Sequence, residues 1–141
     1  MIDNILVDRI HSGDLLFTGN AMQPMFETRA MNEPLQLKPV MTRSSIAGYT
    51  PVLAHPERYL YMEMDDYATL LDSGVIFQLN LGSLLGAYGP QVRERAQILL
   101  KEGAYSRFGT DAHNLRTIQS IYTEEAFDTK TIESLEKISR I

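Results

Sequence analysis

The stretch Gly48–Tyr59, GYTPVLAHPERY, joins a short apolar segment directly to three reactive side chains. Residues 50–54, TPVLA, predict a strand, and the proline after His55 removes a backbone donor and favours an extended conformation for that histidine. The strand is therefore expected to end on His55. Because Glu57 and Arg58 follow at once, we expect an imidazole, a carboxylate and a guanidinium at one strand end.

The composition is that of an ordinary globular protein. The chain has 141 residues, 44% hydrophobic and 22% charged, which suits one domain over residues 1–141. A net charge of −5 and the lack of a basic stripe argue against nucleic-acid binding. Cysteine is absent, so a metal site must use His and carboxylate ligands. No apolar run approaches the roughly 20 residues of a membrane span, and no signal-peptide pattern is present, so we expect a cytoplasmic protein without a membrane span.

Strand and helix patterns alternate along the chain, which favours an α/β fold with parallel strands over a sandwich. In residues 75–81 apolar side chains alternate with Gln78 and Asn80. That pattern suits either the mouth of an α/β barrel or the wet face of an antiparallel strand. Residues 15–18 and 23–28 are expected to form a hairpin. The other expected elements are strands at 50–54, 75–81 and 106–110, and helices at 5–12, 35–46, 65–73, 90–102 and from 128 or 129 onward.

Metal-compatible side chains stand where three of these strands end. Glu27 ends the strand at 23–28, His55 ends the next, and Asp111 and His113 follow the last. Side chains at i and i+2 share a face in an extended chain, so Asp111 and His113 are expected to converge. Imidazole and carboxylate ligands suit zinc, manganese or iron. Such an ion makes hydroxide available for attack on a phosphorus or carbonyl centre.

Arg58 has the planar fork that matches the oxygens of a phosphate. A structural alternative remains open for it, because Arg58 could pair with Glu57 or another surface carboxylate, a contact worth little. A strand-end histidine also often packs without binding a metal. His11 has no acidic partner at a coordinating spacing, and Tyr59 is expected to pack rather than to stack on nucleic acid.

Four motifs follow one another along the chain: FETRAMNEP at 26–34, GYTPVLAHPERYLYM at 48–62, FQLNLGSLLGAYG at 77–89 and FGTDAHN at 108–114. In this order and at this spacing they resemble the bacterial PHP-superfamily protein tyrosine phosphatases of the CpsB/YwqE type, which are encoded with capsule and exopolysaccharide genes. The resemblance covers nearly the whole chain. It implies a distorted (β/α) barrel with divalent metal ions, often manganese, at its C-terminal mouth. It also implies phosphotyrosine in a protein as the substrate, on the bacterial tyrosine kinase that controls polysaccharide export.

The resemblance also implies roles for individual residues. Arg58 corresponds to the arginine that grips the substrate phosphate, and Arg116 to a second family arginine that follows the final ligand pair. The implied metal ligands are Glu27 as the bridging glutamate, His55 from the His-Pro-Glu-Arg motif, and Asp111 with His113 as the final pair.

The chain departs from the family pattern in one respect. Family members begin with a strand that carries His-x-His, whereas the histidines here are His11, His55 and His113, with no such motif. We therefore expect an α/β fold, a partial (β/α) barrel of the PHP type that lacks the N-terminal strands, with impaired metal binding and turnover. Unpaired strand edges in an open barrel favour association with another chain, so self-association is expected. The alternatives are a non-enzymatic remnant or binding module, and a small-molecule phosphoesterase similar to histidinol phosphatases.

Overall fold

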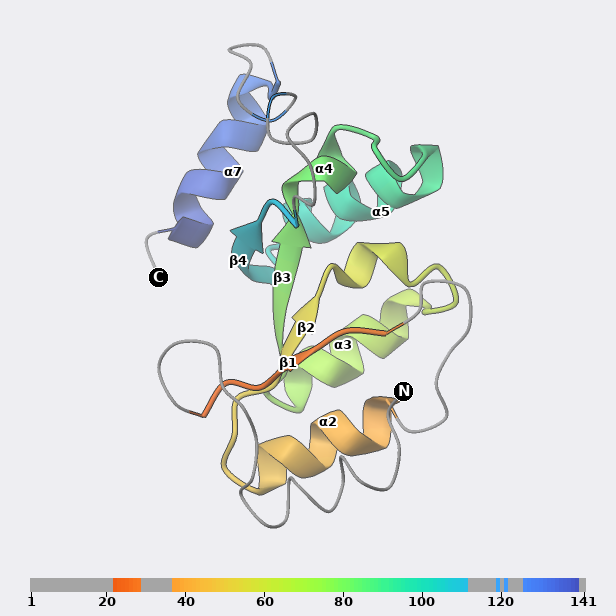
Figure 1. Ribbon diagram of the computed structural model, residues 1–141, viewed down its shortest axis with the longest axis vertical. Helices are drawn as coiled ribbons and strands as arrows, with labels where there is room; N and C mark the ends of the chain where they lie inside the picture. The colour runs from red at the N-terminus through yellow and green to blue at the C-terminus, as the bar shows by residue number, and fades with distance from the viewer. Residues whose placement is uncertain (1–21, 29–36, 112–118, 120, 122–125, 140–141) are drawn as a thin grey trace. The chain divides into compact units, whose positions relative to one another are not determined.

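The computed structural model describes residues 22–28, 37–111, 119, 121 and 126–139 (Figure 1). The chain divides into two compact units. The first unit comprises residues 1–54 and 59–76, and the second comprises residues 55–58 and 77–141. The boundary falls inside the GYTPVLAHPERY stretch, so its strand belongs to the first unit and its His-Pro-Glu-Arg segment to the second.

The first unit combines a pair of parallel strands with two helices. Strand β1 (Met25–Phe26) pairs with β2 (Val52–Ala54), with Phe26 in register with Leu53. Helix α2 (Leu37–Ile46) contacts helix α3 (Met64–Asp72). The core consists of apolar and aromatic side chains with almost no exposure, among them Phe26, Leu37, Val40, Met41, Leu53, Tyr59, Met62, Tyr67 and Leu70.

Helix α2 forms in spite of a proline and a polar run. Pro39 lies in the first turn, where its missing N–H would have had no partner within the helix. Ser44 is buried, and its hydroxyl donates to the carbonyl of Val40 at 2.9 Å, so the polar side chain is satisfied by its own helix. Gly48, with φ of 88°, follows the helix end in the left-handed conformation that glycine adopts readily.

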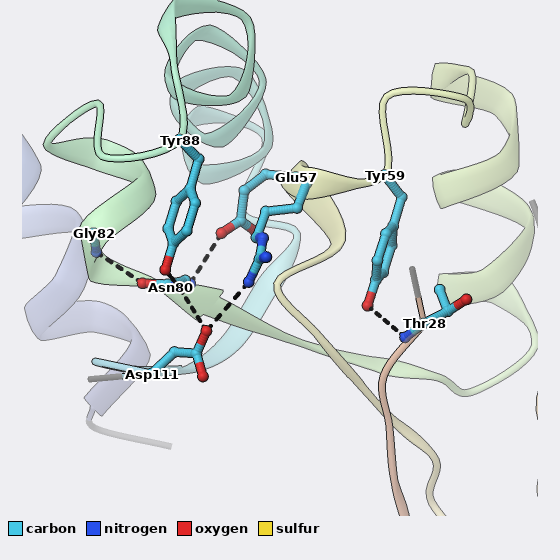
Figure 2. A network of polar contacts seen from close by, with 8 residues as sticks. Thr28, Glu57, Tyr59, Asn80, Gly82, Tyr88 and Asp111 are labelled. Carbon is cyan, nitrogen blue, oxygen red and sulfur yellow. Dashed lines mark hydrogen bonds and ion pairs between the residues drawn. The ribbon is translucent and has the colours of Figure 1, made fainter. Parts of the chain in front are cut away.

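Tyr59 has the packing role that the sequence predicts. Its side chain has no exposed surface, and its ring stacks on Tyr61 at a centroid distance of 5.8 Å. The hydroxyl of Tyr59 accepts the N–H of Thr28 at 3.1 Å, as Figure 2 shows, and its carbonyl accepts the hydroxyl of Tyr67 at 3.3 Å. Tyr59 therefore ties the residues after β1 to α3 within the first unit.

The second unit also contains a parallel strand pair. Strand β3 (Ile76–Asn80), which enters this unit at Phe77, pairs with β4 (Tyr105–Gly109). Helices α4 (Leu81–Leu84) and α5 (Pro90–Lys101) connect the two strands. Helix α5 contacts both α4 and the 3-10 helix η1 (Pro56–Arg58), and α7 (Thr129–Ser139) contacts β4. Because β3 and β4 are parallel, the antiparallel alternative for residues 75–81 is wrong.

The predicted α/β class with parallel strands is confirmed. The expected strands at 50–54, 75–81 and 106–110 correspond to β2, β3 and β4, and the later helices begin within a few residues of their expected starts. Helix α4 was not expected from the sequence. The helix at 5–12 and the first strand of the hairpin lie outside the described residues. Within the described ranges, no helix has the length and apolar character that crossing a membrane requires.

Asp66 links two helices of the first unit. Its Oδ1 lies 2.6 Å from Lys38 Nζ of α2, and its Oδ2 accepts the N–H of Glu63 at 2.9 Å in a capping box at the start of α3. The hydrogen bond from Lys38, followed by that from Glu63, holds the pKa of Asp66 below its ordinary value of 3.8. Because the folded pKa is the lower one, this stabilisation is present above the unfolded pKa and is lost as the pH falls through the folded pKa.

We expect Asp66→Asn to lower the free energy of unfolding by about 1 kcal/mol at neutral pH, because the ion pair is lost and the cap is weakened. The variant should also lose less stability than the wild type as the pH falls below 3.8. Urea unfolding at a series of pH values measures both effects. Asp65→Asn, at the exposed neighbouring position, is the matched control and should behave like the wild type. An Asp66→Asn protein with the wild-type acid profile would contradict the assignment.

Candidate phosphate-binding site

The Arg58 guanidinium lies between a carboxylate and an aromatic ring within the second unit. Its Nη1 donates to Asp111 Oδ2 at 3.2 Å, and its Cζ lies 4.4 Å from the centroid of the Tyr88 ring. The side chains of Arg58 and Asp111 are 24% and 26% exposed, so water partly screens the ion pair. Helix η1 supplies Arg58, and Asp111 lies two residues after β4. The predicted phosphate ligand and a predicted metal ligand are therefore in direct contact.

Asn80, the last residue of β3, contacts both Tyr88 and Asp111 (Figure 2). The residues around Arg58 are called the cluster, and they are Glu57, Arg58, Asn80, Tyr88, Tyr105 and Asp111. Asn80 Nδ2 donates to the hydroxyl of Tyr88 at 3.2 Å and to Asp111 Oδ2 at 3.3 Å. Its Oδ1 accepts the N–H of Gly82 at 2.8 Å, which caps helix α4. Both donors and the acceptor of one buried amide are thus used, and Asn80 is only 2% exposed.

Glu57 is a buried structural carboxylate rather than the partner of Arg58. It has no exposed surface; its Oε1 accepts the N–H of Asn80 at 3.0 Å and its Oε2 accepts the hydroxyl of Tyr105 at 3.0 Å. Burial raises the pKa of Glu57 above its ordinary value of 4.5, while the hydrogen bonds from Asn80 and Tyr105 act in the opposite direction. Among the described residues, the ion pair of Arg58 is with Asp111. The expected alternative, a pairing of Arg58 with a carboxylate, is therefore confirmed, although the partner is Asp111 rather than Glu57.

His55 has a left-handed backbone, with φ of 38°, so the expectation of an extended conformation is wrong. Its N–H donates to the carbonyl of Gln78 at 2.7 Å, and its own carbonyl accepts the N–H of Arg58 at 3.0 Å. These two bonds turn the chain directly into η1 and override the usual preference of a residue before proline. The His55 side chain is buried, with 5% exposure.

Asp111 is also left-handed, with φ of 45°. Asp111 therefore does not continue an extended chain. The expectation that Asp111 and His113 share one face rested on an extended chain, and this condition is not met at Asp111. Aspartate tolerates this conformation better than most residues, because its short side chain can hydrogen-bond locally. Non-glycine residues in such sparsely populated backbone regions cluster at functional sites. Three described non-glycine residues have positive φ, and two of them, His55 and Asp111, are ones that the sequence singled out; the third is Met22.

The predicted metal ligands are distributed over the chain. Glu27 directly follows β1 in the first unit and is exposed, whereas His55 and Asp111 belong to the second unit. His113 and Arg116 lie outside the described residues. In the part of the chain that the structure describes, no three His, Asp or Glu side chains form a group that could hold a metal ion. The donor chemistry suits a divalent cation, but these donors alone are too few, so the metal site stays a prediction.

Sequence reasoning gave no contact to three members of the cluster. Tyr88 lies in the motif at 77–89 but was given no role, and Tyr105 lies outside the four motifs, because the contacts of both depend on tertiary structure. Asn80 was expected at most to line the mouth of a barrel. An asparagine two residues before Gly82 at a strand end is a helix-capping signal, and it could have indicated that Asn80 starts a helix.

Comparison with known proteins agrees with the fold. The sequence model of the family described as capsular polysaccharide synthesis, CpsB/CapC, matches residues 3–127. A solved structure from work on YwqE from Bacillus subtilis and CpsB from Streptococcus pneumoniae, described as metal-dependent tyrosine phosphatases, matches with a TM-score of 0.72 at 20% identity. The match covers 98% of this chain and 60% of that chain, and it shows that the two share a fold.

Two curated relatives match the chain over part of its length. The tyrosine-protein phosphatase YwqE of Bacillus subtilis (strain 168) is 34% identical over 85 residues, which cover 57% of this chain and 32% of YwqE. CapC of Staphylococcus aureus is 26% identical over 89 residues, which cover 62% of this chain and 34% of CapC. The matched region thus spans about a third of the length of each relative. Since the family model matches most of its residues, this chain belongs to the CpsB/CapC family of capsular polysaccharide synthesis proteins.

Proposed function

We propose that this chain carries the phosphate-binding part of a metal-dependent protein tyrosine phosphatase. The observation that supports this most directly is the position of Arg58, whose guanidinium is held by Asp111 and Tyr88 while remaining partly exposed. The family match and the activity named for YwqE support the same reaction class. The proposed substrate is phosphotyrosine in a protein, on a bacterial tyrosine kinase in the cytoplasm.

Arg58 is suited to bind a phosphoryl group. A guanidinium offers five N–H donors in a plane, and two of them match two oxygens of one phosphate. Asp111 balances the positive charge of Arg58 before a substrate arrives, which keeps the side chain in place. A dianionic phosphate carries more charge than the carboxylate, so it competes well for the same guanidinium. Arg116 is proposed as a second phosphate ligand.

A divalent metal ion would supply activation of a water molecule for attack on phosphorus. Manganese is our proposal for that ion, with zinc or iron as alternatives. His55 and Asp111 come from one unit, and both are imidazole or carboxylate donors that such ions accept. The proposed ligand set is Glu27, His55, Asp111 and His113.

The second candidate function is a binding module without turnover. It is favoured by the contacts that join Arg58 to Asp111 and Tyr88, and both of these to Asn80, which are complete within one unit. Such a module would retain Arg58 and its neighbours and would bind a phosphorylated protein segment without hydrolysing it. Metal content and turnover, measured together, separate the two candidates.

We also propose self-association, which the exposed apolar side chains of the first unit support. Met25 on β1 is 46% exposed and Ile46 at the end of α2 is 82% exposed. Sedimentation velocity should show a species larger than 16.0 kDa whose share rises with protein concentration. A single 16.0 kDa species at all concentrations would rule the proposal out.

Arg58→Ala should lower kcat/KM for a phosphotyrosine peptide by about a hundredfold, since a charge-assisted bidentate contact is worth about 3 kcal/mol. Arg58→Lys should recover only a small part of this loss, because an ammonium lacks the planar fork. Arg93→Ala, at an exposed position of α5, is the matched control and should retain wild-type rates. Equal values of kcat/KM for Arg58→Ala and Arg93→Ala would show that Arg58 takes no part in the reaction.

His55→Ala should lower the metal content measured by elemental analysis after equilibration with manganese, because one imidazole ligand is removed. Losing one ligand of several typically weakens a metal site by at least tenfold. His11→Ala serves as the control, since His11 lies outside the four motifs that carry the resemblance to the family. Unchanged metal content in His55→Ala would show that the ligand assignment is wrong. A wild-type chain that holds metal and hydrolyses the peptide would exclude the binding module.

A further inference from the structure

We propose that Tyr88 is a positioning residue for Arg58, and that its ring holds the guanidinium plane in the orientation that presents an edge to phosphate. The inference rests on the proposed function, in which Arg58 binds the phosphoryl group. Tyr88 follows α4 in the loop before α5, and none of the sequence motifs assigned it a role.

The contact between Tyr88 and Arg58 is a face contact. The Arg58 Cζ atom lies 4.4 Å from the ring centroid, well within the range of a cation–π interaction. A contact through the guanidinium carbon uses none of the N–H donors of Arg58, so they stay available for other partners. The Asp111 carboxylate, by contrast, uses the Nη1 donor, for which a phosphate competes. The ring is therefore the neighbour that can keep Arg58 oriented while phosphate is bound.

The orientation of the ring is itself constrained. Asn80 Nδ2 donates to the Tyr88 hydroxyl at 3.2 Å and to Asp111 Oδ2 at 3.3 Å, so one amide holds both neighbours of Arg58. The N–H of Gly82 bonds to Asn80 Oδ1 at 2.8 Å and thereby determines which way the amide faces. A closed ring of contacts within one unit thus joins Tyr88, Arg58, Asp111 and Asn80.

The surroundings of Gly82 show independently that Asn80 and Tyr88 leave little free space next to it. A Cβ atom at this position would lie 3.1 Å from Asn80 Oδ1 and 3.6 Å from Tyr88 Cε2. The first distance is shorter than an ordinary carbon–oxygen contact, so the amide would have to move. Because Asn80 holds the Tyr88 hydroxyl, that movement would be passed to the ring. Gly82→Ala therefore disturbs the orientation of Tyr88 without changing any side chain that contacts Arg58.

The test measures binding of phenylphosphonate, a non-hydrolysable aryl phosphate mimic, to the full chain by isothermal titration calorimetry. Tyr88→Leu removes the ring and should weaken binding about fivefold to tenfold, the range of a partly exposed cation–π contact. Tyr88→Phe keeps the ring and loses only the hydroxyl tether, so it should bind within about threefold of the wild type. Phe108→Leu is the matched control, at another aromatic side chain of the same unit with 40% exposure, and should bind like the wild type.

A second variant and a second measurement show whether weaker binding results from loss of folding. Gly82→Ala, which moves only the amide that holds the Tyr88 hydroxyl, should bind phenylphosphonate like Tyr88→Phe, within about threefold of the wild type. Urea unfolding should show whether each variant remains folded. In peptide assays, the Tyr88→Leu change should appear in KM more than in kcat, because an oriented Arg58 binds ground state and transition state alike.

The outcomes separate this inference from the proposed function. If the wild type binds phenylphosphonate and a folded Tyr88→Leu variant binds it equally well, the inference is overturned and the proposed function stands. A folded Tyr88→Phe variant that binds phenylphosphonate as weakly as Tyr88→Leu would also overturn the inference, because the ring would then not be the part of Tyr88 that supports binding. A folded wild type that binds no phenylphosphonate would remove the proposed function, and the inference with it.

Discussion

The Glu57 carboxylate, with no exposed surface, holds η1 in place beside the two strands of the second unit. Its two oxygens accept hydrogen bonds from the backbone of Asn80 on β3 and from the hydroxyl of Tyr105 on β4. Removal of a carboxylate from water costs several kcal/mol unless hydrogen bonds replace the lost hydration, which explains why both oxygens are engaged. Because Arg58 is the next residue in the chain, the anchoring of Glu57 also determines where the guanidinium begins.

Two contacts orient Arg58 once η1 is fixed, and their free energies can be compared. With about a quarter of each side chain exposed, the ion pair with Asp111 is worth about 1 kcal/mol. The stacking contact with Tyr88 is worth about the same. Neither contact dominates, but they involve different atoms of the guanidinium, since Asp111 accepts from Nη1 whereas Cζ lies over the Tyr88 ring. Two weak contacts to different atoms can therefore restrain an orientation that a single contact would leave free to rotate.

The sequence predicts the elements better than it predicts the site. A continuous apolar run located β2, which is buried along its whole length, and apolar periodicity located β3 and α5. Pro90 in the first turn marked the start of α5. The backbone conformation of His55 could not be predicted. Two hydrogen bonds, one long-range and one local, overrode the preference of a residue before proline for an extended conformation. The contacts of Asp111 with Arg58 and Asn80 join residues 53 and 31 positions apart. No local pattern encodes such a pairing, so only the resemblance to a family indicated that these residues act together.

The cluster around Arg58 lies wholly within one unit, whereas the proposed metal ligands do not. Glu27 belongs to the first unit, His55 and Asp111 to the second, and His113 lies outside the described residues. In the proposed assignment, phosphate binding would use contacts within the second unit, whereas activation of water would need donors from several parts of the chain. Asp111 belongs to both sets, because it is a proposed metal ligand and also holds Arg58 and Asn80. Loss of Glu27 would therefore leave the contacts of Arg58 in place, whereas loss of Asp111 would weaken phosphate binding and metal binding together.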